Sequence, residues 1–350
     1  MELLEQTVAR IEGLNEEKME EAQDRLDSLI KPPGSLGKLE EIAVKLAGIK
    51  GEVFTEVDQK VHIIMAGDHG VVEEGVSTCL SDVTTQMVYN FLNGGAAVNV
   101  LARQVGAKVK VVDIGVINDI EVDGIISRKV KAGTDNFLNG PAMSRSEAVC
   151  SIEVGIEIVE ELIADGASLI GTGEMGIGNT TASSAIIAAV TDLSLDQLVG
   201  RGTGIDDQKL AKKKEVIAQA LEINQPDSED GIDILTKVGG LEIGGLVGVI
   251  LGASAKKTPV MIDGLISAAA AVIAHRLEPK VSNYLIPSHR SVEPGHIRMY
   301  EILDLEPMLE MDMRLGEGTG AVLGMELVEA ATRIISQMAT FEEAGVILNK

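Results

Sequence analysis

Two glutamates in this sequence lie inside glycine turns, a setting in which a carboxylate can take a proton from a bound molecule. Glu174 lies in the segment 171–181 (Gly-Thr-Gly-Glu-Met-Gly-Ile-Gly-Asn-Thr-Thr), and Glu317 lies in the segment 315–320 (Leu-Gly-Glu-Gly-Thr-Gly). Glycines let backbone N–H groups approach an anion, and a helix start adds the positive end of its dipole. A carboxylate beside such a site is unfavourable unless it has a function such as general-base catalysis. For Glu317, helix capping is the other interpretation.

The first of these glycine turns fits the two best-known nucleotide-binding patterns poorly. Gly171, Gly173 and Gly176 satisfy G-x-G-x-x-G. That fingerprint requires a second strand ending in an acid about 20 residues further on, and residues 191–197 are not typical of a strand. Asn179 stands where a P-loop has its lysine. The turn therefore supports neither NAD nor ATP, and no cofactor is predicted.

A further glycine turn, residues 200–207, opens a helix that carries consecutive lysines at 212–214. In a chain of formal net charge −24, this basic cluster is a rare place to hold a phosphate. A solvated helix face is the other interpretation of the lysines. We predict that backbone N–H groups of the glycine turns bind the phosphate, aided by Lys213. The predicted anion-binding residues are Gly173, Gly176, Gly178, Asn179, Thr180, Gly202, Thr203, Gly204 and Lys213.

The composition limits the fold and the partners. Hydrophobic residues make up 45% of the 350 residues but aromatic residues only 2%. The core must therefore consist of small and aliphatic side chains, which suits helices packed on a parallel sheet. The strong negative charge argues against nucleic acid and anionic membranes as partners, because both require basic surfaces.

Unbroken apolar runs separated by helical stretches predict a buried parallel sheet. These runs are residues 61–65, 109–112, 168–170, 259–262 and 283–286. Right-handed crossovers place all their carboxyl ends at one edge of the sheet, where open α/β sheets bind ligands. Polar residues follow the runs, among them Asp263 and Ser291, so we expect a single site at that edge. Turn formation and helix capping are the alternative roles of these residues.

The two chain ends lack strand periodicity. Residues 1–50 predict two helices broken at 31–37, and residues 320–342 predict one long helix. The expected fold is therefore α/β, a Rossmann-like parallel sheet flanked by helices, with a small helical domain built from the two chain ends. The expected division is 1–50 for the N-terminal helices, 51–305 for the sheet domain and 306–350 for the rest of the small domain with the Glu317 turn.

Sequence features also indicate the compartment. Cys79 and Cys150 are too few for a disulfide framework and are expected to be reduced. The first residues, Met-Glu-Leu-Leu-Glu-Gln, are acidic and unlike a signal peptide. The longest apolar stretches, near 244–255 and 264–274, are too short and too rich in small residues to span a bilayer. A cytoplasmic protein is predicted.

The histidines do not have metal-binding spacing, and no metal site is predicted. They are His62, His69, His275, His289 and His296. His69, in Gly-Asp-His-Gly, is the best catalytic candidate among them, but a structural hydrogen bond is favoured for it.

The segment 77–89 follows the first strand and is polar, then helical. Ser81 or Asp82 would cap that helix, and Gln86 and Tyr89 would face the same side. They could line a pocket or belong to an ordinary amphipathic helix.

A series of longer motifs extends from one end of the chain to the other. They are residues 31–37 (Lys-Pro-Pro-Gly-Ser-Leu-Gly), 66–70 (Ala-Gly-Asp-His-Gly), 94–99 (Gly-Gly-Ala-Ala-Val-Asn), 173–180 (Gly-Glu-Met-Gly-Ile-Gly-Asn-Thr), 202–206 (Gly-Thr-Gly-Ile-Asp), 316–320 (Gly-Glu-Gly-Thr-Gly) and 338–345 (Met-Ala-Thr-Phe-Glu-Glu-Ala-Gly). In this order the motifs resemble the nicotinate-nucleotide–dimethylbenzimidazole phosphoribosyltransferase family of cobalamin biosynthesis.

The resemblance implies a reaction in which nicotinate mononucleotide gives its phosphoribosyl group to 5,6-dimethylbenzimidazole. The products would be α-ribazole 5′-phosphate and nicotinate. It also implies a homodimer that needs no metal, with Glu317 as general base and Glu174 in the same active site. Ser81 and Gln86 are similar to the family's base-pocket residues. We expect Gln86, Met175 and Leu315 to form the slot for the flat ring, with Gly316 and Gly318 close to the substrates.

The chemistry of these residue types agrees with that reaction. A β substrate giving an α product requires attack from the opposite face of C1′, so positioning matters most. A glutamate bonded to the ring N–H raises the electron density of the attacking nitrogen, and a nearby carboxylate stabilises positive charge developing on the ribose. A phosphoribosyltransferase for another aromatic base and an acidic nucleotide-sensing binding protein are the alternatives.

Overall fold

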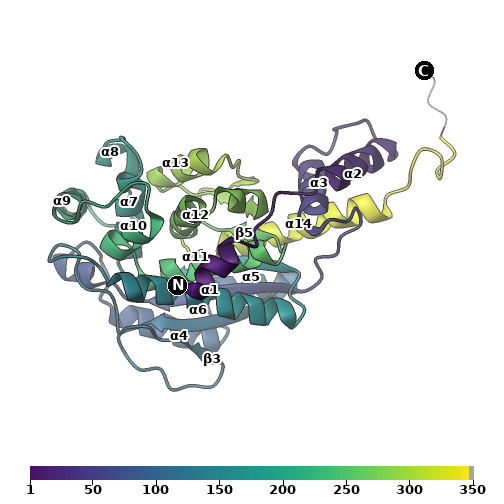
Figure 1. Cartoon of the computed structure of the whole chain (residues 1–350). Coiled ribbons are helices and arrows are strands. Elements are labelled where there is room, and N and C mark those ends of the chain that lie inside the picture. The colour runs from purple at the N-terminus through teal and green to yellow at the C-terminus, as the bar shows by residue number, and fades with distance from the viewer. Residues whose placement is uncertain (347–350) are drawn as a thin grey trace.

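The computed structural model describes residues 1–346. Its centre is a parallel sheet of six strands in the order β3-β2-β1-β4-β5-β6 (Figure 1). The strands are β1 Lys60–Gly67, β2 Lys108–Gly115, β3 Ile125–Ser127, β4 Leu169–Met175, β5 Val260–Ile262 and β6 Leu285–Pro287. A two-stranded parallel sheet, β7 His289–Arg290 with β8 Leu309–Glu310, follows the edge strand β6. The expected α/β class with a Rossmann-like parallel sheet is confirmed.

The strand boundaries differ from the sequence expectation most clearly in three places. The short edge strand β3 was not predicted, because three residues carry too little pattern. The last predicted run begins too early, because residues 283–284 belong to the 3-10 helix η2 Pro279–Tyr284. The strand after residue 168 continues to Met175, so Glu174 lies in β4 and the tight turn comprises only the residues after it.

Helices cover both faces of the sheet. On one face lie α6 Arg145–Ala164 and α11 Leu241–Ala255, which pack closely on each other. On the other lie α4 Asp82–Leu92, α5 Ala97–Val105 and α14 Thr319–Gln337. Side chains of β1 alternate between the two layers, because successive residues of a strand point to opposite faces. Val61, Ile63 and Met65 join the core with α6 and α11, whereas Ile64 and Ala66 join the core with α4 and α5.

The remaining helices connect the strands and border the carboxyl edge. They are η1 Gly70–Glu74, α7 Asn179–Ala189, α8 Leu195–Leu198, α9 Asp207–Asn224, α10 Gly231–Val238, α12 Leu265–Leu277 and α13 Pro294–Leu303. In Figure 1, α7 to α10 lie to the left of the sheet and α12 and α13 lie above it. The structure keeps the expected order of glycine turn and helix: α7 begins within the first predicted turn, at Asn179, and α9 begins just after the second.

The first fifty residues form three helices rather than the two expected. The first, α1 Glu2–Val8, packs against α6 and α11 on the sheet. The other two, α2 Glu16–Ser28 and α3 Lys38–Lys50, pack with α14 around a second apolar core, which also includes Leu169, Met261 and Ile286 from strands of the sheet. This group projects from one side of the sheet body in Figure 1. The division into domains at residues 50 and 305 stays a prediction.

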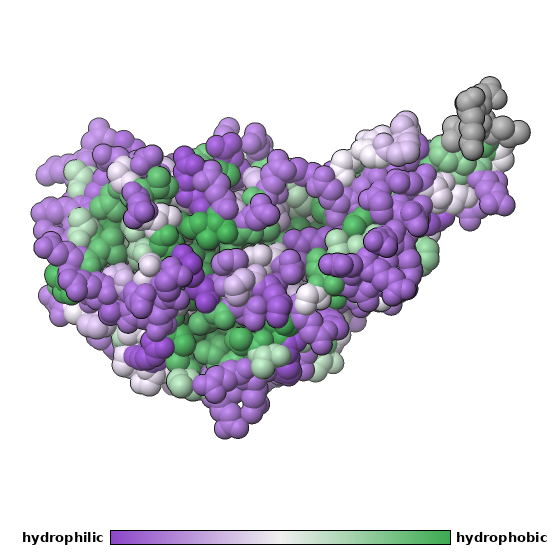
Figure 2. All heavy atoms as spheres, turned by 45° about the horizontal axis from the view of Figure 1, so that its top comes forward, coloured by the Kyte–Doolittle hydropathy of each residue, from purple (hydrophilic) through white to green (hydrophobic). Residues whose placement is uncertain are grey.

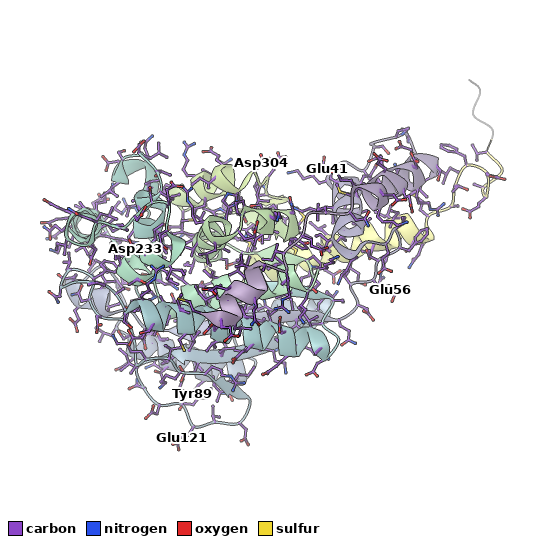
Figure 3. All side chains as sticks on the ribbon, in the orientation of Figure 1. Glu41, Glu56, Tyr89, Glu121, Asp233 and Asp304 are labelled. Atoms are coloured by element: carbon purple, nitrogen blue, oxygen red, sulfur yellow. The ribbon has the colours of Figure 1, made fainter. Side chains whose placement is uncertain are left out.

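Acidic side chains are spread around the molecule. Exposed carboxylates such as Glu41, Glu56 and Glu121 point outward from well-separated parts of the chain (Figure 3). In the space-filling view, hydrophilic residues cover most of the visible face and hydrophobic residues gather in patches between them (Figure 2). Within residues 1–346, no helix has both the length and the apolar character needed to cross a membrane.

Candidate active site

A cavity of about 580 Å³ lies at the carboxyl edge of the sheet. Its wall comes from segments far apart in sequence that follow β4, β5 and β6, together with α4 and the turn before α14. Among the predicted site residues, the cavity is lined by Glu174, Met175, Gly176, Asn179, Thr180, Gly202, Thr203, Asp263, Ser291, Leu315, Gly316 and Glu317. The expected convergence is therefore observed for the ends of β4, β5 and β6, whereas the residues directly after β1 and β2 do not line the cavity.

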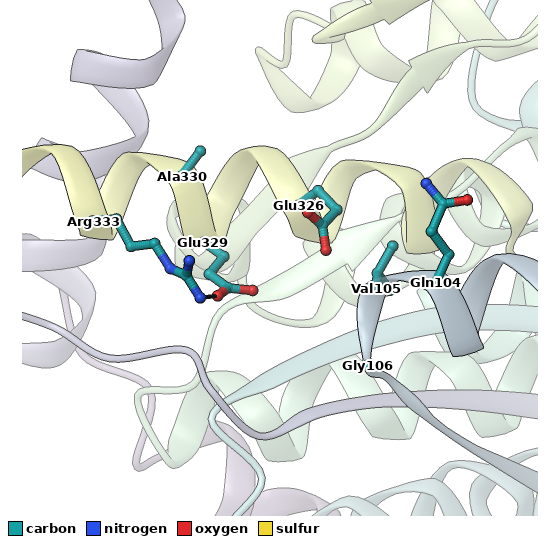
Figure 4. A pocket seen from close by; sticks show the side chains of 7 residues that line it. All are labelled: Gln104, Val105, Gly106, Glu326, Glu329, Ala330 and Arg333. Carbon is teal, nitrogen blue, oxygen red and sulfur yellow. Dashed lines mark hydrogen bonds and ion pairs between the residues drawn. The ribbon is translucent and has the colours of Figure 1, made fainter.

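A second hollow lies between the end of α5 and the outer face of α14 (Figure 4). It lies near Lys60, at the opposite, amino end of β1. Glu329 in this hollow pairs with both Lys60 and Arg333, so its charge is already compensated. No predicted site residue lines it. The cavity at the carboxyl edge is therefore the candidate active site.

Three hydrogen bonds hold Glu317 in place, at its carbonyl oxygen, its N–H and its carboxylate. Its backbone has φ of +62°, an uncommon conformation for a residue with a side chain. Its carbonyl oxygen accepts a hydrogen bond from Nε2 of His62 at 2.8 Å, and its N–H donates to Oε1 of Glu174 at 3.3 Å. Its carboxylate accepts from the backbone N–H of Val98, at the start of α5, at 3.3 Å. Burial raises the pKa of Glu317 above its ordinary value, which makes the carboxylate a better proton acceptor.

Glu174 is the next-to-last residue of β4 and is buried. Its Oε1 accepts from the Glu317 backbone, and its Oε2 accepts from the side-chain amide of Asn179. Burial first, and then the negative charges of Asp263 and Glu242, raise the pKa of Glu174 to about 8. At pH 7 this side chain is therefore mostly protonated, whereas an ordinary glutamate is ionised.

Asp263 follows β5, and its carboxylate caps the N-terminus of α14. Its Oδ1 accepts from the backbone N–H groups of Gly320 and Ala321 at 2.8 and 3.0 Å. These are among the helix N–H groups that have no partner within the helix. The imidazole of His289 lies beside the same oxygen at 3.8 Å. Burial raises the pKa of Asp263, while the neighbouring His289 opposes that shift.

The predicted phosphate site is only partly free to bind an anion. The backbone N–H of Gly202 already donates to Oε1 of the buried Glu293 at 2.9 Å. Lys213 does not lie on a solvated helix face, since it is 1% exposed. Its Nζ donates to Oγ1 of Thr180 at 2.8 Å, and Thr180 lines the cavity. Burial lowers the pKa of Lys213 to about 8. The ammonium lies behind Thr180 in the wall, and no carboxylate among residues 1–346 is bonded to it.

Several predicted glycines serve packing rather than the cavity. Gly173 lies inside β4, where a Cβ would clash with the ring of His62. Gly178 packs against His69 and Val72, and Gly204 and Gly318 are also absent from the cavity lining. Gly176 does line the cavity.

The base-pocket residues on α4 are placed differently from the expectation. Ser81 precedes α4 without a side-chain capping bond, and Gln86 is exposed. Neither lines the cavity; Cys79, Val83 and Met87 do. Val83 and Met87 are four residues apart and share a helix face, and Gln86 lies about 100° away from Met87. The assignment of Ser81 and Gln86 to the base pocket stays a prediction.

Sequence reasoning missed other residues of the wall. His289, Glu293 and Arg314 line the cavity. Each lies within three residues of a predicted site residue, so the loops were found but not every side chain in them.

His69 does not line the cavity and pairs with the buried Glu242 at 2.6 Å, which is the structural hydrogen bond favoured for it from the sequence. No group of three or more His, Cys, Asp or Glu side chains within residues 1–346 could hold a metal ion.

Comparisons with known proteins cover almost the whole chain. A family model described as "Phosphoribosyltransferase" matches residues 11–346. A protein of Desulforamulus reducens is 55% identical over 348 residues, 99% of each chain, and one of Chloroflexus aggregans is 54% identical over 347 residues, 99% of this chain and 98% of that one. Both are named nicotinate-nucleotide–dimethylbenzimidazole phosphoribosyltransferase. The crystal structure of CobT from Thermus thermophilus is 42% identical with a TM-score of 0.92, over 95% of this chain and 100% of that one.

Proposed function

The chain belongs to the nicotinate-nucleotide–dimethylbenzimidazole phosphoribosyltransferase family, and from that membership we propose the reaction that it catalyses. The enzyme transfers the 5-phosphoribosyl group of nicotinate mononucleotide to 5,6-dimethylbenzimidazole. The products are α-ribazole 5′-phosphate and nicotinate, for the nucleotide loop of cobalamin. The observation that carries the proposal is the convergence of Glu317, Glu174 and Asp263 on one cavity at the strand ends.

Glu317 is the general base. The benzimidazole attacks C1′ through its free ring nitrogen, and a new N–C1′ bond forms. The bond from C1′ to the nicotinate nitrogen breaks, and its electron pair stays on the pyridine ring. The proton on the other benzimidazole nitrogen passes to the Glu317 carboxylate, whose raised pKa favours this transfer. Attack from the face opposite the leaving nicotinate gives inversion at C1′.

Negative charge in the cavity stabilises the ribose as positive charge develops on it. The ionised forms of Glu317 and Asp263 can supply this charge in a site sheltered from water. Glu174 is protonated at neutral pH and can therefore donate a hydrogen bond to a ribose or ring oxygen. The two glutamates thus have different roles set by their surroundings, although both lie in glycine-rich segments.

The phosphate is placed at the end of the cavity lined by Gly176, Thr180 and Ser291. Lys213 supports this end from behind Thr180, and the helix start of α7 adds a positive dipole. The flat base is placed against the apolar side chains of Met175 and Leu315, facing α4.

A homodimer and a cytoplasmic location complete the proposal. The family resemblance supports the dimer, and sedimentation of the purified protein measures it. The two cysteines are both free thiols in the structure, which suits a reducing compartment.

The test is to mix the protein with nicotinate mononucleotide and 5,6-dimethylbenzimidazole and to measure both products. We expect equal amounts of nicotinate and α-ribazole 5′-phosphate. Nucleotide binding without release of nicotinate would instead indicate a nucleotide sensor. Turnover with adenine or a phenol but not with 5,6-dimethylbenzimidazole would indicate a phosphoribosyltransferase for another aromatic base.

A further inference from the structure

The imidazole of His62 is a buried polar group that contacts the proposed base but takes no part in the reaction described above. His62 lies within β1 and is 0% exposed. The next residues of the strand, Ile63 and Ile64, are aliphatic core residues with the same exposure. A polar ring at such a position is unfavourable unless it makes a hydrogen bond. Within the described residues its hydrogen bond is the one to the carbonyl oxygen of Glu317, 255 residues further along the chain, at 2.8 Å.

The chemistry of that contact fixes the tautomer. Burial lowers the pKa of His62 to about 4, so the ring is neutral at pH 7 and carries one N–H. A carbonyl oxygen can only accept, so the proton must be on Nε2. Nδ1 has no hydrogen-bond partner among the described residues. The N–H of His62 is therefore directed to the main chain of Glu317.

Three glycines enclose the ring. A Cβ at Gly171 would lie 2.8 Å from Nδ1 of His62, which is closer than real Cβ contacts allow. A Cβ at Gly173 or at Gly318 would clash with the Nε2 side of the ring. Gly171 and Gly173 come from β4, and Gly318 follows Glu317 directly. These glycines leave space for an imidazole between the sheet and the catalytic turn.

The turn that receives this hydrogen bond has an uncommon backbone. Gly316, Glu317 and Gly318 all have positive φ, at 84°, 62° and 87°. For a residue with a side chain this conformation costs of order 1 kcal/mol and persists only where its surroundings hold it. Without His62, the buried carbonyl of Glu317 would lose its partner, and the turn could rotate to find another. Such a rotation would carry the carboxylate away from the cavity.

We propose that His62 is a positioning residue, which fixes the main chain of Glu317 so that its carboxylate meets the ring N–H of the attacking base. His62 does not line the cavity, so it is placed to act through Glu317. The kinetic part of this inference rests on the proposed transferase function. A displacement of about 1 Å at a reacting group can lower the rate about 100-fold.

The first experiment compares His62→Leu with His62→Gln. Leucine fills similar space without an N–H, whereas the glutamine amide can donate to the same carbonyl. We expect His62→Leu to lower kcat about 10- to 100-fold with the KM for nicotinate mononucleotide changed less than about 2-fold. We expect His62→Gln to keep kcat within about 3-fold of the wild type. An unchanged kcat in His62→Leu would overturn the proposal.

Two controls separate positioning from loss of stability. Ile63→Ala removes a buried side chain from the same strand on the opposite face, where it cannot reach Glu317. It should lower the melting temperature at least as much as His62→Leu while leaving kcat within about 2-fold. In the Glu317→Gln background, the effect of His62→Leu on kcat should nearly vanish, because both changes disable the same group. An undiminished effect there, or an equal loss of kcat in Ile63→Ala, contradicts the proposal.

A measurement without substrates keeps this inference separate from the proposed reaction. Proton–nitrogen NMR of the histidine rings should show His62 with a slowly exchanging proton on Nε2 and a neutral ring from pH 8 down to about 5. A proton on Nδ1, or a ring that titrates near pH 6.5, would overturn the assigned hydrogen bond. If the NMR result holds but the wild-type protein releases no nicotinate, the proposed function fails while the structural link between His62 and Glu317 stands.

Discussion

Glu317 and Glu174 share one cavity, yet at the scale of single residues they differ in what they can do with a proton. Glu317 combines a carboxylate oxygen that has no hydrogen bond within residues 1–346 with a backbone fixed at both its N–H and its carbonyl. Glu174 has both oxygens bonded to neighbouring donors and is mostly protonated at pH 7. The structure therefore favours Glu317 as the acceptor of the base proton.

Replacing each glutamate by glutamine tests this division. Glu317→Gln should lower kcat by about 10²- to 10⁴-fold, the usual effect of removing a general base, with little change in nucleotide affinity. A residual rate should remain because the attacking nitrogen already has a lone pair. Glu174→Gln should mainly weaken substrate binding. Steady-state kinetics and nucleotide titration measure both. Near-normal kcat in Glu317→Gln, with turnover lost at intact affinity in Glu174→Gln, would reverse the assignment.

The pKa of Glu174 also predicts how stability depends on pH. Its folded-state pKa of about 8 lies above the ordinary value of 4.5, so the folded state holds this proton more tightly than the unfolded state. The stability contributed by Glu174 is therefore present below pH 4.5 and is lost as the pH rises toward 8. Each pKa unit corresponds to about 1.4 kcal/mol. Between pH 5.5 and 7.5 the wild type should lose about 2–3 kcal/mol more than Glu174→Gln in urea unfolding.

A matched control for that experiment is Glu41→Gln, which removes an exposed carboxylate on α3. Its stability should follow the wild type across the same pH range. Parallel curves for wild type and Glu174→Gln would show that Glu174 is ionised in the folded protein.

At the scale of elements, the N-terminus of α14 is capped by a side chain that follows strand β5. No side chain of the preceding turn caps this helix; Asp263, after β5, bonds the N–H groups of Gly320 and Ala321 instead. Asp263→Ala should therefore destabilise the protein by about 1–2 kcal/mol, as loss of a helix cap does, and should also lower kcat by shifting the Glu317 turn. Asp263→Asn keeps one acceptor oxygen and should recover most of the stability.

Ser144→Ala is the matched control, because Ser144 caps α6 with its own side chain and does not line the cavity. It should cost similar stability in thermal or urea unfolding and leave kcat unchanged. An equal loss of kcat in both variants would show that helix capping alone, and not the position of the turn, limits the rate.

Helix α9 brings one cation to the cavity wall. Asp206 caps this helix, and Lys213 then reaches Thr180 from within it. Lys213→Met keeps the apolar stem and removes the charge. It should weaken nicotinate mononucleotide by roughly 1.5–3 kcal/mol, or about 10- to 100-fold, and change binding of 5,6-dimethylbenzimidazole little. Calorimetric titration of each ligand measures this, with the exposed Lys212→Met as control. Equal weakening of both ligands would place the phosphate elsewhere.

At the scale of the whole molecule, the net charge of −24 opposes an anionic substrate. Salt screens charges across the surface much more than it screens a buried contact such as that of Lys213. We therefore expect kcat/KM for nicotinate mononucleotide to rise by a few-fold between about 20 and 200 mM KCl. The KM for the neutral 5,6-dimethylbenzimidazole should stay constant over the same range. A fall in kcat/KM with salt would show that the local cations dominate the approach of the nucleotide.

The sequence by itself determined the class of fold, the edge at which the site lies and the two glutamates. Unbroken apolar runs indicate buried parallel strands, and right-handed crossovers then place their carboxyl ends together. These features depend on local composition and on general rules of chain geometry. For the same reason, Asp263 and Ser291 could be assigned to the site from their places after predicted strands.

Only the tertiary structure decided which groups meet across long distances in the chain. Gly173 was expected at the phosphate but lies beside the ring of His62, and the Gly202 N–H is bonded to Glu293, 91 residues away. Val83 and Met87 rather than Gln86 face the cavity, because the rotation of α4 depends on its packing against the sheet. Periodicity reports which face of an element is buried, but not which residue of another element it meets there. Those pairings follow from three-dimensional packing, and they set the protonation of Glu174 and the position of Glu317.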